Sequence, residues 1–263
     1  MQVDLINGHH LHYRRKGDPD APLVVFANSL GTDLRIWDGV REHLGGSIQS
    51  FCYDKRGHGL SDAPPAPYTL EEHIDDLAGL LENLRIRRAI LCGISVGGMI
   101  ALGLAARLPG LVQGLILCDT AHKIGSEALW NARIEQIRQH GIESIADGIL
   151  ERWFSEHFRQ VAPAAVAGWR NMLVRTPLEG YIGTCTALRD ADLTAAAESL
   201  RLPVRCLCGS QDGATPPDLV RSMSALIAGS RFQLVAGAGH LPCIEAPEEL
   251  AAVIRALITE IQS

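Results

Sequence analysis

Short apolar runs that end in turn residues recur along the chain and predict strands. They lie at 23–27, 48–54, 88–94, 114–119, 204–209 and 231–235. These runs are almost continuously hydrophobic rather than alternating, which is typical of parallel strands buried on both faces. Periodic segments at 33–44, 70–84, 96–107, 217–227 and 247–262 predict helices. The alternation of strands and helices predicts an α/β fold with a doubly wound, mostly parallel sheet.

The segment 122–195 interrupts this alternation. It contains no strand pattern and holds three of the four tryptophans. Gly141, Pro163, Pro177 and the stretch 180–183 divide it into several helical pieces. We therefore expect a core made of residues 1–121 and 196–263, with a helical cap inserted at 122–195.

Composition and charge exclude several function classes. The 263 residues are 47% hydrophobic, which argues against a disordered chain. With 24 basic and 30 acidic side chains the net charge is −6, and no Lys/Arg-rich block is present, so we expect neither nucleic acid nor a membrane as a partner. No apolar run approaches the ~20 residues of a membrane span. The N-terminal sequence lacks the hydrophobic segment of a secretory signal, so we expect a cytoplasmic protein.

The seven cysteines are scattered through apolar runs, and their number is odd. This favours buried, reduced thiols over a disulfide framework. Cys206 and Cys208 form a C-x-C pattern in the strand at 204–209. A metal or redox site would require C-x-x-C spacing and further ligands, so we expect no metal.

Residues 93–97 read Gly-Ile-Ser-Val-Gly, after a predicted strand and before a predicted helix. This G-x-S-x-G pattern is typical of a nucleophile elbow, in which the glycines permit a tight turn. The turn places the serine at a helix N-terminus, where negative charge is favoured. Ser95 is the predicted nucleophile, and an ordinary structural turn is the alternative.

A serine hydroxyl needs a base to activate it, because it is a weak nucleophile at neutral pH. His240 follows the last predicted strand, in AGAGH, and is expected at the same sheet edge as Ser95. His58, flanked by glycines in DKRGHGLSD, is the alternative base. The histidines at 9, 10 and 12 are expected in solvent near an N-terminal hairpin.

An acid that orients the base is expected at the carboxyl end of another strand. Asp212 follows the strand at 204–209 in a loop shaped by glycine and proline, and it is favoured over Asp119, which ends the strand at 114–119. The resulting chain order, Ser95, Asp212 and His240, is the order found in α/β-hydrolases.

The elbow together with GSQDGATPP, AGAGH and DKRGHGLSD resembles the α/β-hydrolases over essentially the whole chain. Four further segments resemble the bacterial 3-oxoadipate enol-lactonases of aromatic catabolism: FANSLGTDLRIWD (26–38), DTAHKIGSEALWNARIEQIR (119–138), LERWFSEHFR (150–159) and GYIGTCTALRDADL (180–193). The loop after 23–27 reads Asn-Ser-Leu-Gly rather than the His-Gly usual in the superfamily. This departure is also similar to the enol-lactonases.

The resemblance implies a serine hydrolase that opens a small anionic lactone, 3-oxoadipate enol-lactone, through an acyl-enzyme in the β-ketoadipate pathway. It implies that Leu30 and Val96 supply the backbone N–H groups of the oxyanion hole, and that no cofactor is needed. The alternatives are a broad carboxylesterase or perhydrolase-like enzyme on the same triad, and a ligand receptor with residual hydrolase activity.

The acetate arm of such a lactone requires a cation in this acidic protein. Arg133 is the first candidate, because it lies three residues from Trp130 on a predicted cap helix. Trp130 and Trp153 are expected to line the pocket. Arg152 is expected to face water, and Arg189 to pair with the neighbouring Asp190 and Asp192.

Overall fold

The computed structural model describes all 263 residues, which form one eight-stranded sheet with helices around it. The strands are β1 (Gln2–Ile6), β2 (His9–Lys16), β3 (Leu23–Ala27), β4 (Gln49–Tyr53), β5 (Ala89–Ile94), β6 (Val112–Cys118), β7 (Val204–Gly209) and β8 (Arg231–Val235). The helices are η1 (Leu34–Trp37, a 3₁₀ helix), α1 (Asp38–Leu44), α2 (Leu70–Asn83), α3 (Val96–Arg107), α4 (Glu127–His140), α5 (Glu143–Trp153), α6 (Glu156–Val161), α7 (Pro163–Val174), α8 (Leu178–Asp190), α9 (Thr194–Ser199), α10 (Pro217–Leu226), α11 (Pro242–Glu245) and α12 (Pro247–Gln262).

The sheet has the order β1-β2-β4-β3-β5-β6-β7-β8. All pairs from β4 to β8 are parallel, and only β1 and β2 run antiparallel to their neighbours. The predicted mostly parallel α/β sheet is therefore confirmed, with six predicted strands correct to within two residues at their ends. The predicted helix 33–44 is divided into η1 and α1, and the Asp33 side chain caps η1 by accepting the N–H of Arg35.

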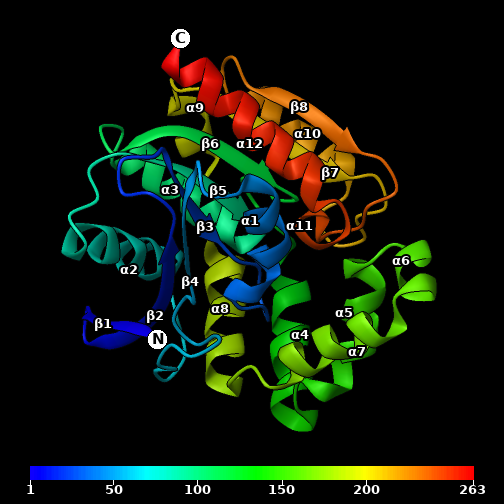
Figure 1. The fold of residues 1–263 in the computed structure, drawn as a ribbon. Coiled ribbons are helices and arrows are strands. Elements are labelled where there is room, and N and C mark those ends of the chain that lie inside the picture. Colours follow the sequence, from blue (N-terminus) through cyan, green and yellow to red (C-terminus); the bar gives the residue numbers. More distant parts are fainter.

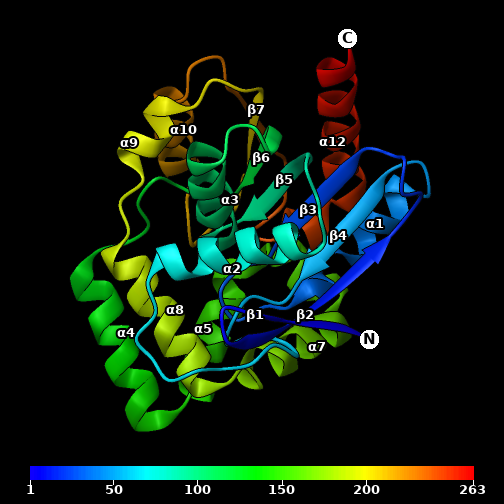
Figure 2. The same ribbon diagram turned by 90° about the vertical axis from the view of Figure 1, so that its left-hand side faces the viewer.

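Helices cover both faces of the sheet (Figure 2). Helices α1 and α12 pack together on one face, and α2, α3, α9 and α10 lie on the other. The first ten residues of α3, from Val96 to Ala105, are all buried. Small residues make this close approach possible: a Cβ atom at Gly98 would overlap the Thr120 side chain. The core is therefore densest around β5, β6 and α3, next to the predicted nucleophile.

Helices α4–α8 lie together beside the sheet, in the lower part of Figure 1. Helix α4 packs against α8 and α5, and α5 packs against α7. Helix α9 instead contacts α3 and α10, so it packs with the helices that cover the sheet. The division between core and cap at residues 121/122 and 195/196 stays a prediction.

The prediction that the stretch 180–183 divides two helical pieces is wrong. Gly180 and Gly183 lie inside α8. A Cβ atom at Gly180 would overlap the backbone of Gly57, and one at Gly183 would overlap the Tyr68 ring. These glycines let α8 contact the loop between β4 and α2. They act through close packing rather than as helix breakers.

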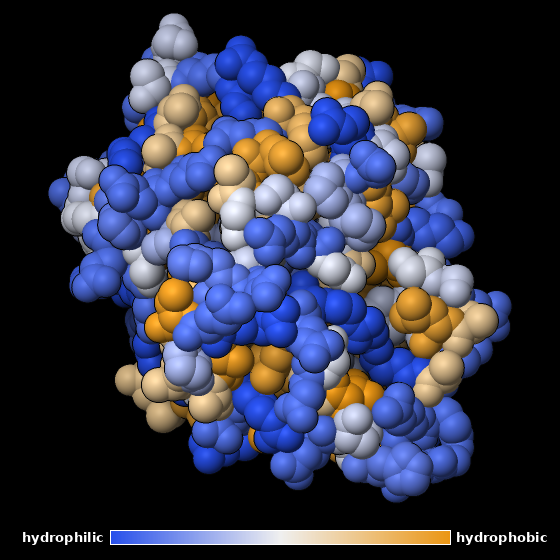
Figure 3. Space-filling model, turned by 90° about the vertical axis from the view of Figure 1, so that its right-hand side faces the viewer, coloured by the Kyte–Doolittle hydropathy of each residue, from blue (hydrophilic) through white to orange (hydrophobic).

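The seven cysteines are all buried and unpaired, as the sequence predicts. None of the helices combines the length and the apolar character needed to cross a bilayer. On the face of the molecule shown in Figure 3, apolar side chains form separate patches within a largely hydrophilic surface.

Candidate active site

The strand order brings two catalytic segments to one crevice. Strand β3 lies between β4 and β5 in the sheet. The next strand in the chain, β4, is therefore on one side of β3, and the strand after it, β5, is on the other side. In sheets of this kind, ligands bind outside the carboxyl ends of the strands at that reversal point. The loop 28–31 leaves β3 there, and Ser95 leaves β5.

Ser95 has the backbone geometry of a sharp strand-to-helix turn. Its φ of 56° and ψ of −124° lie outside the regions common for residues with a side chain. A Cβ atom at Gly97 would overlap the carbonyl of Ala27, so the turn requires glycine there. The Ser95 carbonyl accepts hydrogen bonds from the N–H of Gly98 and from the Thr120 hydroxyl, at 2.9 and 2.6 Å. The strained conformation is thus fixed by its surroundings.

The structure pairs His240 with Asp212. His240 Nδ1 lies 2.9 Å from Asp212 Oδ2, and both residues are buried. The other carboxylate oxygen accepts the N–H groups of Ala214 and Thr215 at 2.7 and 3.0 Å. Burial raises the pKa of Asp212, but His240 and Thr215 outweigh this and hold the pKa below its usual value. An ionised Asp212 therefore orients the imidazole with Nδ1–H toward the carboxylate and Nε2 available as a base.

The alternative base, His58, holds a loop instead. Its Nε2 accepts the N–H of Gly31 at 3.0 Å, and its Nδ1 lies 3.1 Å from the Arg56 carbonyl. Burial and the nearby Lys55 lower the pKa of His58 well below its usual value, which keeps the ring neutral. Both ring nitrogens are occupied, so His58 is unsuited to take a proton from Ser95.

The alternative acid, Asp119, does not contact the base through a hydrogen bond. Its Oδ1 accepts the N–H of Gly209 at 2.8 Å, and its Oδ2 has no partner. Among the two acids that the sequence offered, Asp212 is the one bonded to His240.

The expectation that His12 is solvated is wrong. The residue is 3% exposed, and its Nδ1 lies 2.8 Å from Asp54 Oδ2. Asp54 also accepts the N–H groups of Leu34 and Leu60, so it ties η1 and a later loop to β2. Its partner comes from a distant part of the chain, and the local pattern around His12 carries no sign of it. His10, in contrast, is exposed and pairs with Asp62.

The two backbone N–H groups predicted to form the oxyanion hole have no hydrogen-bond partner within the chain. Leu30 N–H makes no hydrogen bond, and Val96 is the first residue of α3, so its N–H has no partner within the helix. Lys55 Nζ donates to the Ser29 carbonyl at 2.5 Å, which fixes the loop next to Leu30. Lys55 is buried, and desolvation lowers its pKa to about 7. Sequence reasoning missed this lysine, although it lies in the quoted DKRGHGLSD segment.

Ser95 and His240 line one cavity of about 160 Å³, together with residues of α4, α5 and α8. Leu30 and the predicted cap residues Trp130, Arg133 and Trp153 line the same cavity. The Arg133 guanidinium lies 4.9 Å from the centre of the Trp130 ring. The structure therefore brings the predicted cap residues to the predicted nucleophile and base.

Arg152 also lines this cavity, so the expectation that it faces water is wrong. Its Nε donates to the Gly148 carbonyl at 3.1 Å, and no carboxylate pairs with it. Burial and the charge of Arg133 lower the pKa of Arg152. Arg189, as predicted, pairs with Asp190, at 2.7 Å, and it also donates to Asn131.

Comparisons with known proteins show which family the chain resembles. Residues 24–253 match the alpha/beta hydrolase family. The chain is 32% identical to 3-oxoadipate enol-lactonase 2 of Acinetobacter baylyi, over 94% of this chain and 92% of that protein. The crystal structure of the enol-lactonase from Burkholderia xenovorans LB400 superposes with a TM-score of 0.95 and 36% identity, over 98% of this chain and all of the other. A malate-bound thermophilic esterase from Thermogutta terrifontis is 28% identical, with a TM-score of 0.93 over the whole of both chains.

Proposed function

The chain belongs to the α/β hydrolase family, and on that premise we propose that it hydrolyses 3-oxoadipate enol-lactone to 3-oxoadipate. The observation that carries the proposal is the cavity itself. It is lined by Ser95, by a histidine that is hydrogen-bonded to Asp212, and by two arginines whose guanidinium groups have no carboxylate partner. Hydrolases named for this lactone are similar to the chain over nearly its full length.

In the first half of the proposed reaction, Ser95 Oγ attacks the lactone carbonyl carbon while His240 Nε2 takes the hydroxyl proton. The N–H groups of Leu30 and Val96 stabilise the oxyanion of the tetrahedral intermediate. When the ring C–O bond breaks, the enol oxygen leaves and receives the proton from His240. Resonance with the C=C bond makes this oxygen a good leaving group, and the released enol then becomes a ketone.

In the second half, a water molecule attacks the acyl-enzyme and His240 takes its proton. The intermediate collapses, Ser95 regains its proton, and 3-oxoadipate is released. Asp212 keeps the imidazole in the tautomer with Nδ1–H and stabilises its positive form. Each step uses only side chains and backbone groups of this chain together with water.

We propose that Arg133 and Arg152 bind the acetate arm of the lactone. A guanidinium removed from water without a counter-ion is unfavourable, and two of them near each other add repulsion. The lowered pKa of Arg152, caused by burial and by Arg133, is the sign of that repulsion. A carboxylate in the cavity would offset both costs, whereas a neutral ester would not.

A broad carboxylesterase is the second candidate, because the Thermogutta terrifontis relative is an esterase. A panel of lactones and esters, with products identified by mass spectrometry, distinguishes the two. We expect rapid opening of the anionic enol-lactone, slow turnover of neutral esters, and no turnover of either by Ser95→Ala. Equal efficiency on neutral and anionic substrates would favour the esterase. Slow turnover throughout, with strong thermal stabilisation by a ligand, would favour a receptor.

A further inference from the structure

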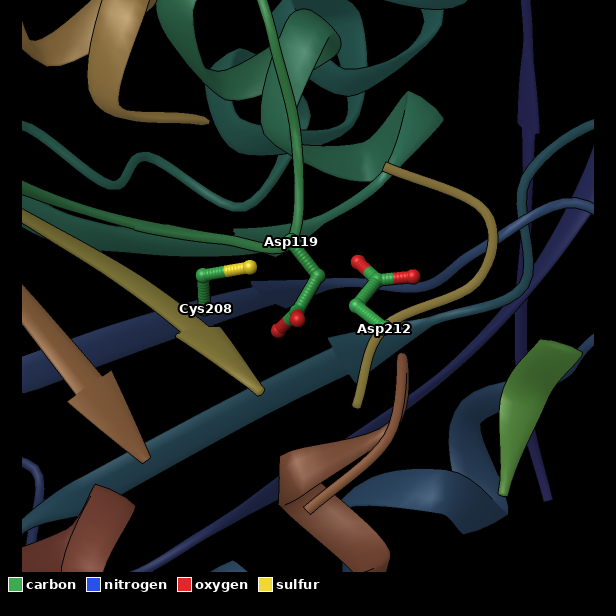
Figure 4. A group of neighbouring side chains, drawn as sticks. All are labelled: Asp119, Cys208 and Asp212. Atoms are coloured by element: carbon green, nitrogen blue, oxygen red, sulfur yellow. The ribbon is translucent and has the colours of Figure 1, made fainter. Parts of the chain in front are cut away.

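A second buried carboxyl group lies beside the predicted catalytic acid. Asp119 follows β6, Cys208 lies on β7 and Asp212 lies in the next loop (Figure 4). One carboxylate oxygen of each aspartate and the Cys208 sulfur lie within 4.8 Å of one another, and all three residues are buried. Asp119 also has a φ of 46°, a conformation that a non-glycine residue holds only when its surroundings impose it.

No lysine or arginine neutralises Asp119. The titratable groups facing it are the thiols of Cys118 on β6, Cys208 on β7 and Cys243 on α11, together with Asp212 and, beyond it, His240. Two ionised carboxylates at this separation repel strongly, so one of a buried pair keeps its proton. Burial raises the pKa of Asp119 well above its usual value, and the charge of Asp212 raises it further.

The hydrogen bonds indicate which carboxyl is neutral. Asp212 accepts from two N–H groups and faces His240, so its charge is well stabilised. Asp119 accepts only the Gly209 N–H at Oδ1, and its Oδ2 is buried without a partner. An orphaned oxygen of this kind is costly unless it carries a proton and donates it.

The Cys208 thiol does not act as an anionic ligand here. Its Sγ donates to the carbonyls of Gly209 and Thr215, at 3.4 and 3.5 Å. Burial raises the pKa of Cys208 far above its usual value, so the sulfur keeps its proton. To bind a metal ion, this cluster would have to lose the Cys208 thiol proton. It would also have to lose the hydrogen bonds that Asp212 accepts.

We propose that Asp119 is a protonated positioning residue whose Oδ2–H donates a hydrogen bond to Asp212. This inference rests on the proposed roles of Asp212 and His240. It gives Asp212 a neutral donor that restrains its orientation without placing a second negative charge near the imidazole.

The test compares Asp119→Asn with Asp119→Ala in the full chain. Asparagine tolerates positive φ and offers both an N–H donor and a carbonyl acceptor. We expect it to retain kcat/KM within about threefold, with the acid limb of the pH–rate profile unmoved. Alanine removes the donor to a charged group, so kcat/KM should fall about tenfold or more. The acid limb of the Asp119→Ala pH–rate profile should move to higher pH. Without the hydrogen bond from residue 119, the negative charge of Asp212 stabilises protonated His240 more strongly.

An ionised Asp119 predicts a different result for Asp119→Asn. Removing a negative charge at this distance would move the acid limb to lower pH by roughly one unit or more, which would overturn the proposal. A phenyl ester serves as substrate if the lactone is not turned over, so the outcome is independent of the proposed substrate.

Infrared spectroscopy gives a readout that requires no activity. The wild-type chain should show the carbonyl stretch of a neutral carboxyl between about pH 7 and 8, where ordinary carboxyls are ionised. The band should be missing from Asp119→Asn. If Asp119→Asn does not fold, the test is whether the wild-type band persists over this pH range. Persistence of the band supports a protonated carboxyl. Absence of the band, or a stoichiometric metal ion in the purified protein, would refute a protonated Asp119.

Discussion

The two arginines of the cavity provide the sharpest test of substrate recognition. Arg133→Met and Arg152→Met delete the charge while keeping much of the apolar stem, so packing and charge can be separated. Neither arginine has a carboxylate partner in the free protein, so no ion pair within the chain is lost. The whole electrostatic effect should therefore appear in the interaction with an anionic substrate.

The expected magnitude follows from the kind of hydrogen bond removed. A hydrogen bond between charged groups contributes roughly 1.5–3 kcal/mol, which is about 10- to 150-fold in kcat/KM. We expect a loss in this range for each variant with the anionic enol-lactone, and less than about threefold with a neutral phenyl ester. If one carboxylate contacts both guanidinium groups, the double variant should lose less than the product of the two single losses.

Stability measurements complement the kinetics. Burial and mutual repulsion lower the pKa of Arg152, so Arg152→Met should unfold at the same temperature as the wild type or higher.

A cap arginine that already has a partner is the matched control. Arg189 pairs with Asp190 and Asn131, and Arg189→Met should change neither substrate's kcat/KM. Equal losses on the lactone and the ester would refute the recognition role and would mean that the arginines hold the cap in place.

Three further predictions concern the proposed catalytic residues and the buried Lys55. Ser95→Ala should abolish turnover, by several orders of magnitude, without lowering the unfolding temperature, and more than a few per cent residual activity would exclude Ser95 as the nucleophile. Asp212→Asn should be folded and nearly inactive because the amide stabilises the wrong imidazole tautomer, and a milder loss than in Asp119→Asn would reverse the two acids. The pKa of Lys55 is lowered to about 7 in the folded chain, against about 10.4 in the unfolded chain. Between these two pH values the unfolded chain binds more protons than the folded chain. The free energy of unfolding should therefore rise with pH in this range. Urea unfolding at pH 7 and 9 should show the wild type gaining roughly 1 kcal/mol per pH unit relative to Lys55→Met, and equal gains in both proteins would contradict the lowered pKa.

The fold was predictable because its signals are local and repeated. Continuous apolar runs define buried parallel strands, and the amphipathic pattern of 247–262 coincides with α12. Ser95, Asp212 and His240 were predicted for a related reason: each follows a strand, and parallel strands end at one sheet edge.

The errors fall where a side chain's environment comes from a distant segment. His12 looks like a surface residue on an N-terminal strand, yet Asp54, 42 residues later, buries and binds it. Arg152 lies on the polar side of its own helix, but the loop at Gly213 and the cap helices enclose that side. Hydrophobic periodicity locates the apolar face of a helix. It does not show which polar face the rest of the chain will cover.

The features that oppose folding stability gather around one cavity. Of the four non-glycine residues with positive φ, Ser95 lies in the cavity wall and Asp119 lies behind Asp212. Lys55, buried beneath the Leu30 loop, and the unpaired guanidinium of Arg152 add desolvated charge in the same region. Strained backbone and unpaired buried charge persist only where the surrounding structure imposes them and function benefits. Their concentration around Ser95 is a physical reason, independent of any resemblance, to assign the chemistry to this edge of the sheet.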